Sequence, residues 1–115
     1  MKIEFREATK DNVTVTVIDI VGDLDARTAP DFKDQLKEVV ESGKVNLIIN
    51  LEQVSYMDSA GLGVLVSGLK NANRANGDLK IVGMQTDVRN IFELTRLNQV
   101  FSIFDSEDDA LASFA

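Results

Sequence analysis

The feature that most restricts the fold of this chain is a strand-like run that is almost entirely apolar, VNLIINL, from Val45 to Leu51. A run of this length and composition is typical of a strand buried on both faces, as in a parallel sheet covered by helices. It is followed by segments in which apolar residues recur at helical spacing, separated by further short strand-like runs. Such alternation predicts parallel strands joined by helical crossovers.

The first twenty residues show a different pattern. Apolar and polar residues alternate in IEFREA from Ile3 and in VTVTVIDIV from Val13, with the turn-like sequence KDN between them. Alternation indicates strands with one solvated face, and the short turn predicts an antiparallel hairpin. We expect the first of these strands at an edge of the sheet.

Helix signals follow every predicted strand except the first. Thr28 and Ser106 are suitable N-caps, Thr86 is a candidate cap, and Gly43 and Gly77 supply stops. We expect helices within residues 28–43, 59–77, 86–97 and 106–115, and short strands at 79–84 and 100–104. The sequence therefore predicts an α/β fold: one domain over residues 1–115, with a mixed, mostly parallel sheet of about five strands and about four helices.

The composition narrows the possible functions. The 115 residues include no histidine and no cysteine. Serine–histidine and cysteine–histidine catalysis in their usual forms, and most zinc sites, are thereby disfavoured. Carboxylates remain possible ligands for magnesium or calcium. We expect no enzymatic activity, no cofactor and no resident metal.

Charge and hydropathy point to a cytoplasmic protein. The absence of cysteine fits a reducing compartment, the N-terminus is too polar for a signal peptide, and no apolar run is long enough to span a membrane. Acidic residues outnumber basic ones by 19 to 12, for a net charge of −7. This excess disfavours nucleic acid as a partner and favours a basic patch on another protein.

Two loops are candidate functional sites, because function in such sheets gathers where loops leave the carboxyl ends of strands. They span residues 22–27 and 54–61, and both carry acids. The second contains Ser59 at or beside the start of a helix. Ser59 is interpretable as an ordinary helix cap or as an acceptor of phosphate, since a helix N-terminus tolerates added negative charge.

The neighbours of Ser59 also have two interpretations. Gly61 and Gly63 destabilise a first helical turn, so we expect close approach of another backbone, either the protein's own sheet or a docked partner. Close packing within the fold is the simpler explanation and is favoured more for Gly63 than for Gly61. Asp58 is either a loop acid that accepts backbone N–H groups or a residue that orients the serine hydroxyl or a phosphoryl-bound magnesium ion supplied with a kinase's nucleotide. Asp23 and Asp25 are either solvated turn acids or part of the site, and all three acids could lie near one another.

A resemblance to a known family rests on four stretches. MDSAGLGVLV from Met57 is the core, supported by VGDLDARTAPDF from Val21, LIINLEQVSYMDS from Leu47 and LTRLNQVFSIF from Leu94. The chain resembles the STAS-domain anti-sigma factor antagonists of bacteria over essentially its whole length. The glycine pattern matches no nucleotide-binding motif, and a serine hydrolase is disfavoured because D-S-A-G lacks the preceding glycine and no histidine is present.

The resemblance implies a phosphorylation switch. In the family, an anti-sigma factor with serine-kinase activity phosphorylates the motif serine, here Ser59, and a serine phosphatase removes the phosphate. The unmodified antagonist binds the anti-sigma factor and frees a sigma factor. The family's loop aspartate matches Asp25, and Ala60 stands where many relatives have a second hydroxyl residue. We expect a monomer that exchanges protein partners. The residues expected to support the site or contact the partner are Asp23, Asp25, Asp58, Ala60, Gly61, Leu62 and Gly63.

An alternative is a STAS interaction module in another signalling or transporter-regulating pathway, without control by phosphorylation.

Overall fold

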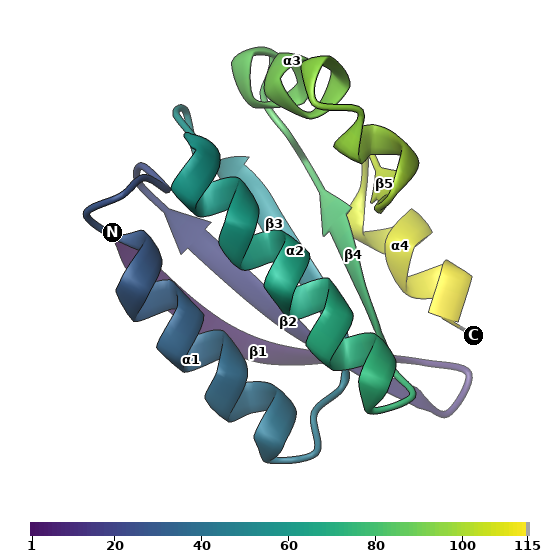
Figure 1. Ribbon diagram of the computed structural model, residues 1–115. Helices are drawn as coiled ribbons and strands as arrows, with labels where there is room; N and C mark the ends of the chain where they lie inside the picture. Colours follow the sequence, from purple (N-terminus) through teal and green to yellow (C-terminus); the bar gives the residue numbers. More distant parts are fainter. Residues whose placement is uncertain (115) are drawn as a thin grey trace.

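The structure is a computed structural model, and it describes residues 1–114 (Figure 1). Five strands form one sheet in the order β1-β2-β3-β4-β5. The strands are β1 (Lys2–Lys10), β2 (Val13–Val21), β3 (Asn46–Gln53), β4 (Asp78–Val82) and β5 (Ser102–Phe104). The helices are α1 (Ala29–Glu41), α2 (Ser59–Arg74), α3 (Thr86–Leu94) and α4 (Glu107–Phe114), with a short 3-10 turn, η1 (Leu97–Gln99).

The predicted mixture of antiparallel and parallel pairing is confirmed. Strand β1 pairs antiparallel with β2 along its full length, and each later pair is parallel. Asp11 and Asn12 close the hairpin with φ angles of 52° and 67°. A two-residue turn with both φ values positive matches the twist of the strands, and aspartate and asparagine tolerate it. As expected, β1 lies at an edge of the sheet.

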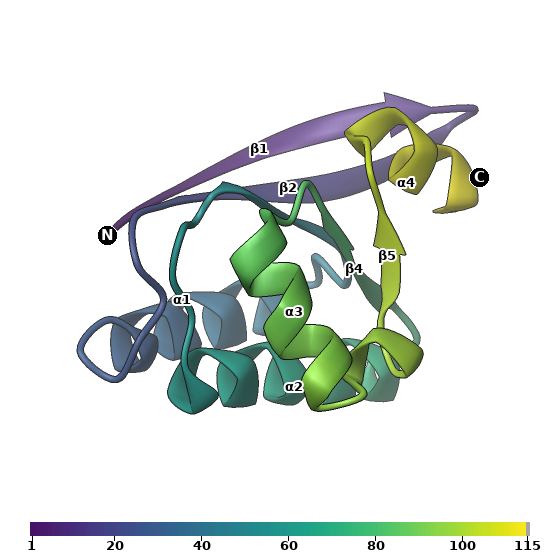
Figure 2. The same ribbon diagram turned by 90° about the horizontal axis from the view of Figure 1, so that it is seen from above.

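Helices cover both faces of the sheet. On one face, α1, α2 and α3 pack over the main core, and Figure 2 shows these three helices on the same side of the strands. Strand β3 is buried on both faces, as predicted: Leu47 and Ile49 belong to this core, whereas Ile48 belongs to a second cluster with α4.

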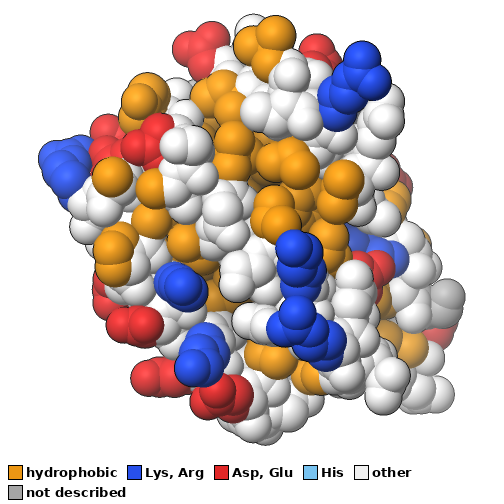
Figure 3. All heavy atoms as spheres, in the orientation of Figure 1, with side chains coloured by type: hydrophobic (Ala, Val, Ile, Leu, Met, Phe, Trp, Pro, Cys, Tyr) orange, Lys and Arg blue, Asp and Glu red, His pale blue; other side chains and the backbone are white. Residues whose placement is uncertain are grey.

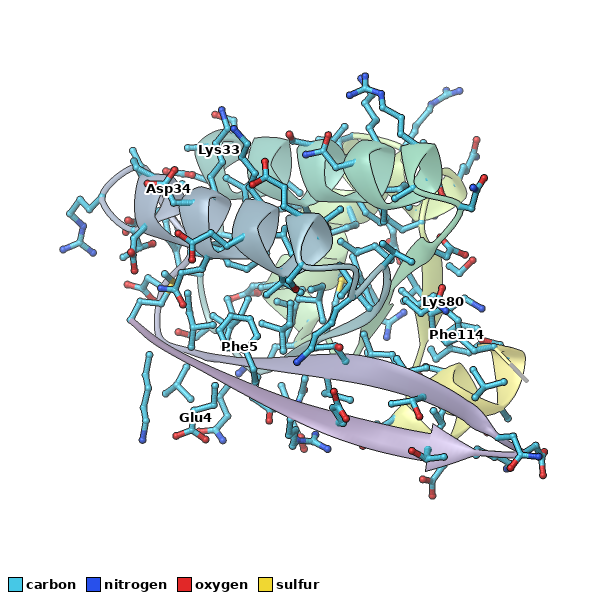
Figure 4. All side chains as sticks on the ribbon, turned by 90° about the horizontal axis from the view of Figure 1, so that it is seen from below. Glu4, Phe5, Lys33, Asp34, Lys80 and Phe114 are labelled. Carbon is cyan, nitrogen blue, oxygen red and sulfur yellow. The ribbon has the colours of Figure 1, made fainter. Side chains whose placement is uncertain are left out.

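Polar contacts hold α4 against the second face. Arg6 of β1 donates to Asp19 Oδ2 at 2.7 Å and also to the carboxylate of Glu107 at the start of α4. Lys80 of β4 is buried, donates to Ser113 Oγ at 2.6 Å and lies 4.0 Å from the ring centroid of Phe114. Figure 4 shows Lys80 and Phe114 side by side at this end of the molecule.

Several predicted boundaries are wrong. Helix α3 ends at Leu94 rather than Leu97, because Arg96 adopts a left-handed conformation with φ of 61°. Thr86 is the first helical residue, and Gln85 occupies the cap position. Strand β4 begins at Asp78 and ends at Val82, and β5 is limited to residues 102–104.

The expected cap at Ser106 is confirmed, since its hydroxyl accepts the Asp109 N–H at 3.1 Å. Thr28 occupies the cap position of α1, but its side chain makes no capping bond to that helix. In the part of the chain that the structure describes, no helix is long and apolar enough to cross a membrane.

Candidate functional site

The two loops singled out from the sequence lie side by side. Leu24 in the first and Met57 in the second form an isolated parallel bridge. The Leu24 N–H donates to the Tyr56 carbonyl at 3.0 Å, and the Asp58 N–H donates back to the Leu24 carbonyl at 3.3 Å. The bridge extends the β2–β3 pairing past the ends of both strands. It fixes the start of α2 relative to the loop that precedes α1.

Asp58 is the residue that holds this arrangement. It is the N-cap of α2, and its Oδ1 accepts from the N–H groups of Ala60 at 2.9 Å and Gly61 at 3.1 Å. Its Oδ2 accepts from the Ala26 N–H, in the first loop, at 3.0 Å. Both carboxylate oxygens are thus engaged by backbone. Of the two interpretations of Asp58, the geometry favours the backbone acceptor.

Asp25 organises the first loop. It is only 8% exposed, and its Oδ2 accepts from the Arg27 guanidinium at 2.8 Å while its Oδ1 accepts from the Arg27 N–H at 2.9 Å. The Arg27 guanidinium holds the pKa of the Asp25 carboxyl below its ordinary value. Thr28 completes the loop, because its hydroxyl accepts from the Asp25 N–H and donates to the Asp23 carbonyl. This bonding explains why Thr28 does not cap α1.

Ser59 is the first residue of α2 and is exposed to solvent. Within residues 1–114 its hydroxyl has no hydrogen-bond partner. The capping function that a serine often performs belongs here to Asp58, so the fold does not depend on the Ser59 hydroxyl. An exposed hydroxyl beside the positive end of a helix dipole can accept a charged group without disturbing the core. The neighbouring Asp58 carboxylate would add repulsion to such a group.

Gly61 meets the expectation of close backbone approach, whereas Gly63 and Leu62 differ from expectation. A Cβ at Gly61 would overlap the Leu24 carbonyl and lie 2.8 Å from Leu24 Cγ, whereas a Cβ at Gly63 would meet nothing within 4 Å in the described structure. Close packing therefore explains Gly61, and the preference for Gly63 was wrong. Leu62 was expected to support the site or contact the partner, but its side chain is buried in the main core.

The acids of the two loops do not gather into a metal site. Asp23 is partly exposed, with Oδ2 3.9 Å from an Arg27 nitrogen, whereas the Asp25 and Asp58 carboxylates are held as described above. Among the described residues, no group of three or more aspartate or glutamate side chains is arranged to hold a metal ion.

Comparison with known proteins identifies the family. The family model of the STAS domain matches residues 6–110. An anti-sigma-B factor antagonist of Listeria monocytogenes is 33% identical over 109 residues, which are 95% of this chain and 93% of that protein. The chain belongs to the STAS-domain family of anti-sigma factor antagonists.

Solved structures of STAS proteins have the same fold. The crystal structure of an anti-sigma factor antagonist from Mycobacterium paratuberculosis matches with a TM-score of 0.81 and 27% identity, covering 97% of this chain and 93% of that one. The structure of the Bacillus cell fate determinant SpoIIAA in its phosphorylated form matches with a TM-score of 0.75 and 20% identity, covering 99% and 100% of the two chains. At that identity the second match shows the fold alone.

One feature of this STAS domain was missed in the sequence. A shallow groove of about 520 Å³ separates the first turns of α1 from those of α2. Its lining consists of Ala26, Ala29, Pro30, Lys33, Ala60, Gly63, Val64 and Ser67. No local pattern marks these residues, because the groove exists only where two helices pack side by side. Of the residues singled out from the sequence, Ala60 and Gly63 line it.

Proposed function

We propose that this STAS domain acts in the cytoplasm as a partner-switching antagonist of an anti-sigma factor. In its unmodified form it binds the anti-sigma factor and so frees a sigma factor for transcription. The anti-sigma factor is itself the serine kinase, and transfer of a phosphoryl group from its nucleotide to the Ser59 hydroxyl ends the complex. A serine phosphatase restores the unmodified state.

The observation that carries this proposal is that two neighbouring residues at the start of α2 have different roles. Asp58 makes the capping and loop-bridging hydrogen bonds, and Ser59, next to it, is exposed. The serine is consequently accessible to a modifying protein and dispensable for the fold. The 33% identity to the Listeria antagonist over nearly the whole of both chains supports the same role.

The expected charge change is large enough to act as a switch. Phosphate adds about 1.5 to 2 negative charges at neutral pH. Release of a useful complex requires about a thousandfold loss of affinity, or about 4 kcal/mol. Burial of an unpaired charge at an interface costs several kcal/mol. The adjacent Asp58 carboxylate adds like-charge repulsion. One phosphate on Ser59 is therefore enough to release the partner without any refolding of the STAS domain.

The test uses each anti-sigma factor kinase encoded in the native genome. We expect the unmodified chain to bind one of them in calorimetry, and we expect that protein with ATP to add one phosphate, measured by intact mass. The Ser59→Ala variant should bind and remain unmodified, and Ser59→Asp should bind at least a hundredfold more weakly. Ser102→Ala, an exposed serine on β5 outside both loops, is the control and should behave as the wild type.

Two results would contradict the proposal. Failure of the unmodified chain to bind any of these proteins would exclude the antagonist role. Binding without phosphorylation by any kinase, unaffected by Ser59→Asp, would instead identify a constitutive STAS interaction module.

A further inference from the structure

Gly63 has no structural reason to be glycine. It lies in the second turn of α2, in ordinary helical conformation, and a side chain there would meet nothing within 4 Å among residues 1–114. The two other glycines of this helix are different, since a Cβ at Gly61 or Gly68 would collide with Leu24 or Leu36. Glycine is among the least favourable residues in a helix, so Gly63 destabilises α2 without any gain in packing.

The space above Gly63 belongs to the α1–α2 groove, because Gly63 is one of the residues that line it. Apart from Lys33 and Ser67, the groove lining consists of glycine, alanine, valine and proline. Figure 4 shows Lys33 on α1, on the side of the helix layer that faces away from the sheet. In the described part of the chain, Lys33 forms no salt bridge. The groove is therefore an apolar depression with one unpaired cation at its edge.

Helical geometry connects this groove to Ser59. At 3.6 residues per turn, Gly63 lies one turn beyond Ser59 and is rotated by about 40° from it toward Ala60 and Ser67, which face the groove. A protein that covers Ser59 and enters the groove must pass directly over Gly63. A side chain at this position would separate the two surfaces.

We propose that the anti-sigma factor inserts an apolar side chain into the α1–α2 groove, with its backbone lying over Gly63 and an acidic group beside Lys33. This inference rests on the proposed function. It adds a second contact region, distinct from the hydroxyl that carries the switch, and it gives a reason why Gly63, already expected at the partner surface, must lack a side chain. An apolar side chain suits the groove because it would bury mostly apolar lining.

The test exploits opposite effects of one substitution on stability and binding. Gly63→Ala should raise the melting temperature by roughly 2–4 °C, because alanine is the better helix former. The same variant should bind the anti-sigma factor about tenfold more weakly, since extra atoms overpack a filled interface. Gly63→Leu should fold equally well and bind at least a hundredfold more weakly. Asn73→Leu, exposed on the same helix but outside the groove lining, should leave affinity unchanged.

A second pair of variants tests whether the positive charge of Lys33 contributes to binding of the anti-sigma factor. Lys33→Glu should weaken binding about tenfold, with a difference that shrinks at high salt. Lys37→Glu introduces the same charge change one turn further along α1, outside the groove lining, and should have a smaller effect.

The outcomes separate this inference from the proposed function. If Ser59→Asp abolishes binding while Gly63→Leu binds as tightly as the wild type, the proposed phosphorylation switch is supported and the groove proposal is wrong. If Gly63→Ala lowers the melting temperature, the glycine has a role in the fold and the inference is also wrong. If no anti-sigma factor binds the unmodified chain, both proposals are contradicted.

Discussion

Single residues at the start of α2 divide into those that build the fold and those that face outward. Contacts within the fold account for Gly61, Leu62 and the Asp58 carboxylate, which pack against Leu24, lie in the main core and cap α2, respectively. Among the described residues, no such contact accounts for Ser59 or Gly63. The sequence identified all five but not this division. Gly61 and Gly63 are equivalent in a one-dimensional pattern, and only the bridge between Leu24 and Met57 shows which one meets a backbone.

Gly61→Ala should destabilise the protein by about 2 kcal/mol, because its methyl group would overlap the Leu24 carbonyl and force the two loops apart. Urea unfolding measures the change. Gly63→Ala is the matched control, in which the same atoms are added to the same helix at an open position. Equal stabilities of these two variants would contradict the packing described for Gly61.

Asp58→Ala should cost about 2 kcal/mol of stability, since it removes both the cap of α2 and the hydrogen bond to Ala26. Asp58→Asn keeps one accepting oxygen and should cost less. Asp23→Ala serves as the control, because the structure assigns its partly exposed carboxylate only a 3.9 Å ion-pair contact with Arg27. A loss of less than 0.5 kcal/mol for Asp58→Ala, by the same unfolding measurement, would show that Asp58 does not hold the loops.

Whole helices and strands were predictable where their pattern was long and regular. The alternation in the first two strands gave the correct antiparallel hairpin, and the apolar run at residues 45–51 gave a buried strand in the parallel part of the sheet, but not which strand lies beside it. Boundaries in the last third were not predictable. Helix α3 stops early because Arg96 turns left-handed, a conformation unusual for arginine. Strand β5 begins only at Ser102, because Val100 caps the 3-10 turn η1.

The ion pair between Arg6 on β1 and Asp19 on β2 gives an expectation for the pH dependence of stability. Arg6 holds the pKa of Asp19 below its ordinary value, chiefly through a hydrogen bond at 2.7 Å. Because the folded pKa is lower than the unfolded one, the stabilisation is present above about pH 4 and is lost as the pH falls through the folded value. Arg6→Gln should therefore be less stable than the wild type by about 1 kcal/mol at pH 7, with a gap that narrows below pH 4.

Urea unfolding at several pH values measures this gap. Lys2→Gln is the control, since its pair with Glu4 is exposed on both sides. A gap that stays constant down to about pH 2 would contradict the role assigned to Asp19.

The molecule as a whole combines a five-stranded sheet with an outer helical surface that is only partly polar. Figure 3 shows apolar side chains gathered on this surface between α2 and α3. The net charge of −7 suggested a basic partner, but the groove beside Ser59 carries a lysine, and total charge does not reveal local charge. The groove itself was not predictable, because it depends on which helices become neighbours.

Ser59→Asp should leave the architecture intact. The side chain is exposed and a negative charge is favourable near a helix N-terminus, so we expect a change in stability within about 0.5 kcal/mol. Thermal unfolding and the amide NMR spectrum test this, with Ser55→Asp as the control. Loss of the folded spectrum in Ser59→Asp alone would mean that the charge acts by unfolding the protein.

The most direct test of the switch is the affinity of the anti-sigma factor for the same preparation of this chain before and after phosphorylation at Ser59. Calorimetry should show a dissociation constant raised about a thousandfold by the phosphate, with full recovery after phosphatase treatment. Equal affinities for the two forms, with one phosphate confirmed on Ser59, would contradict the central claim.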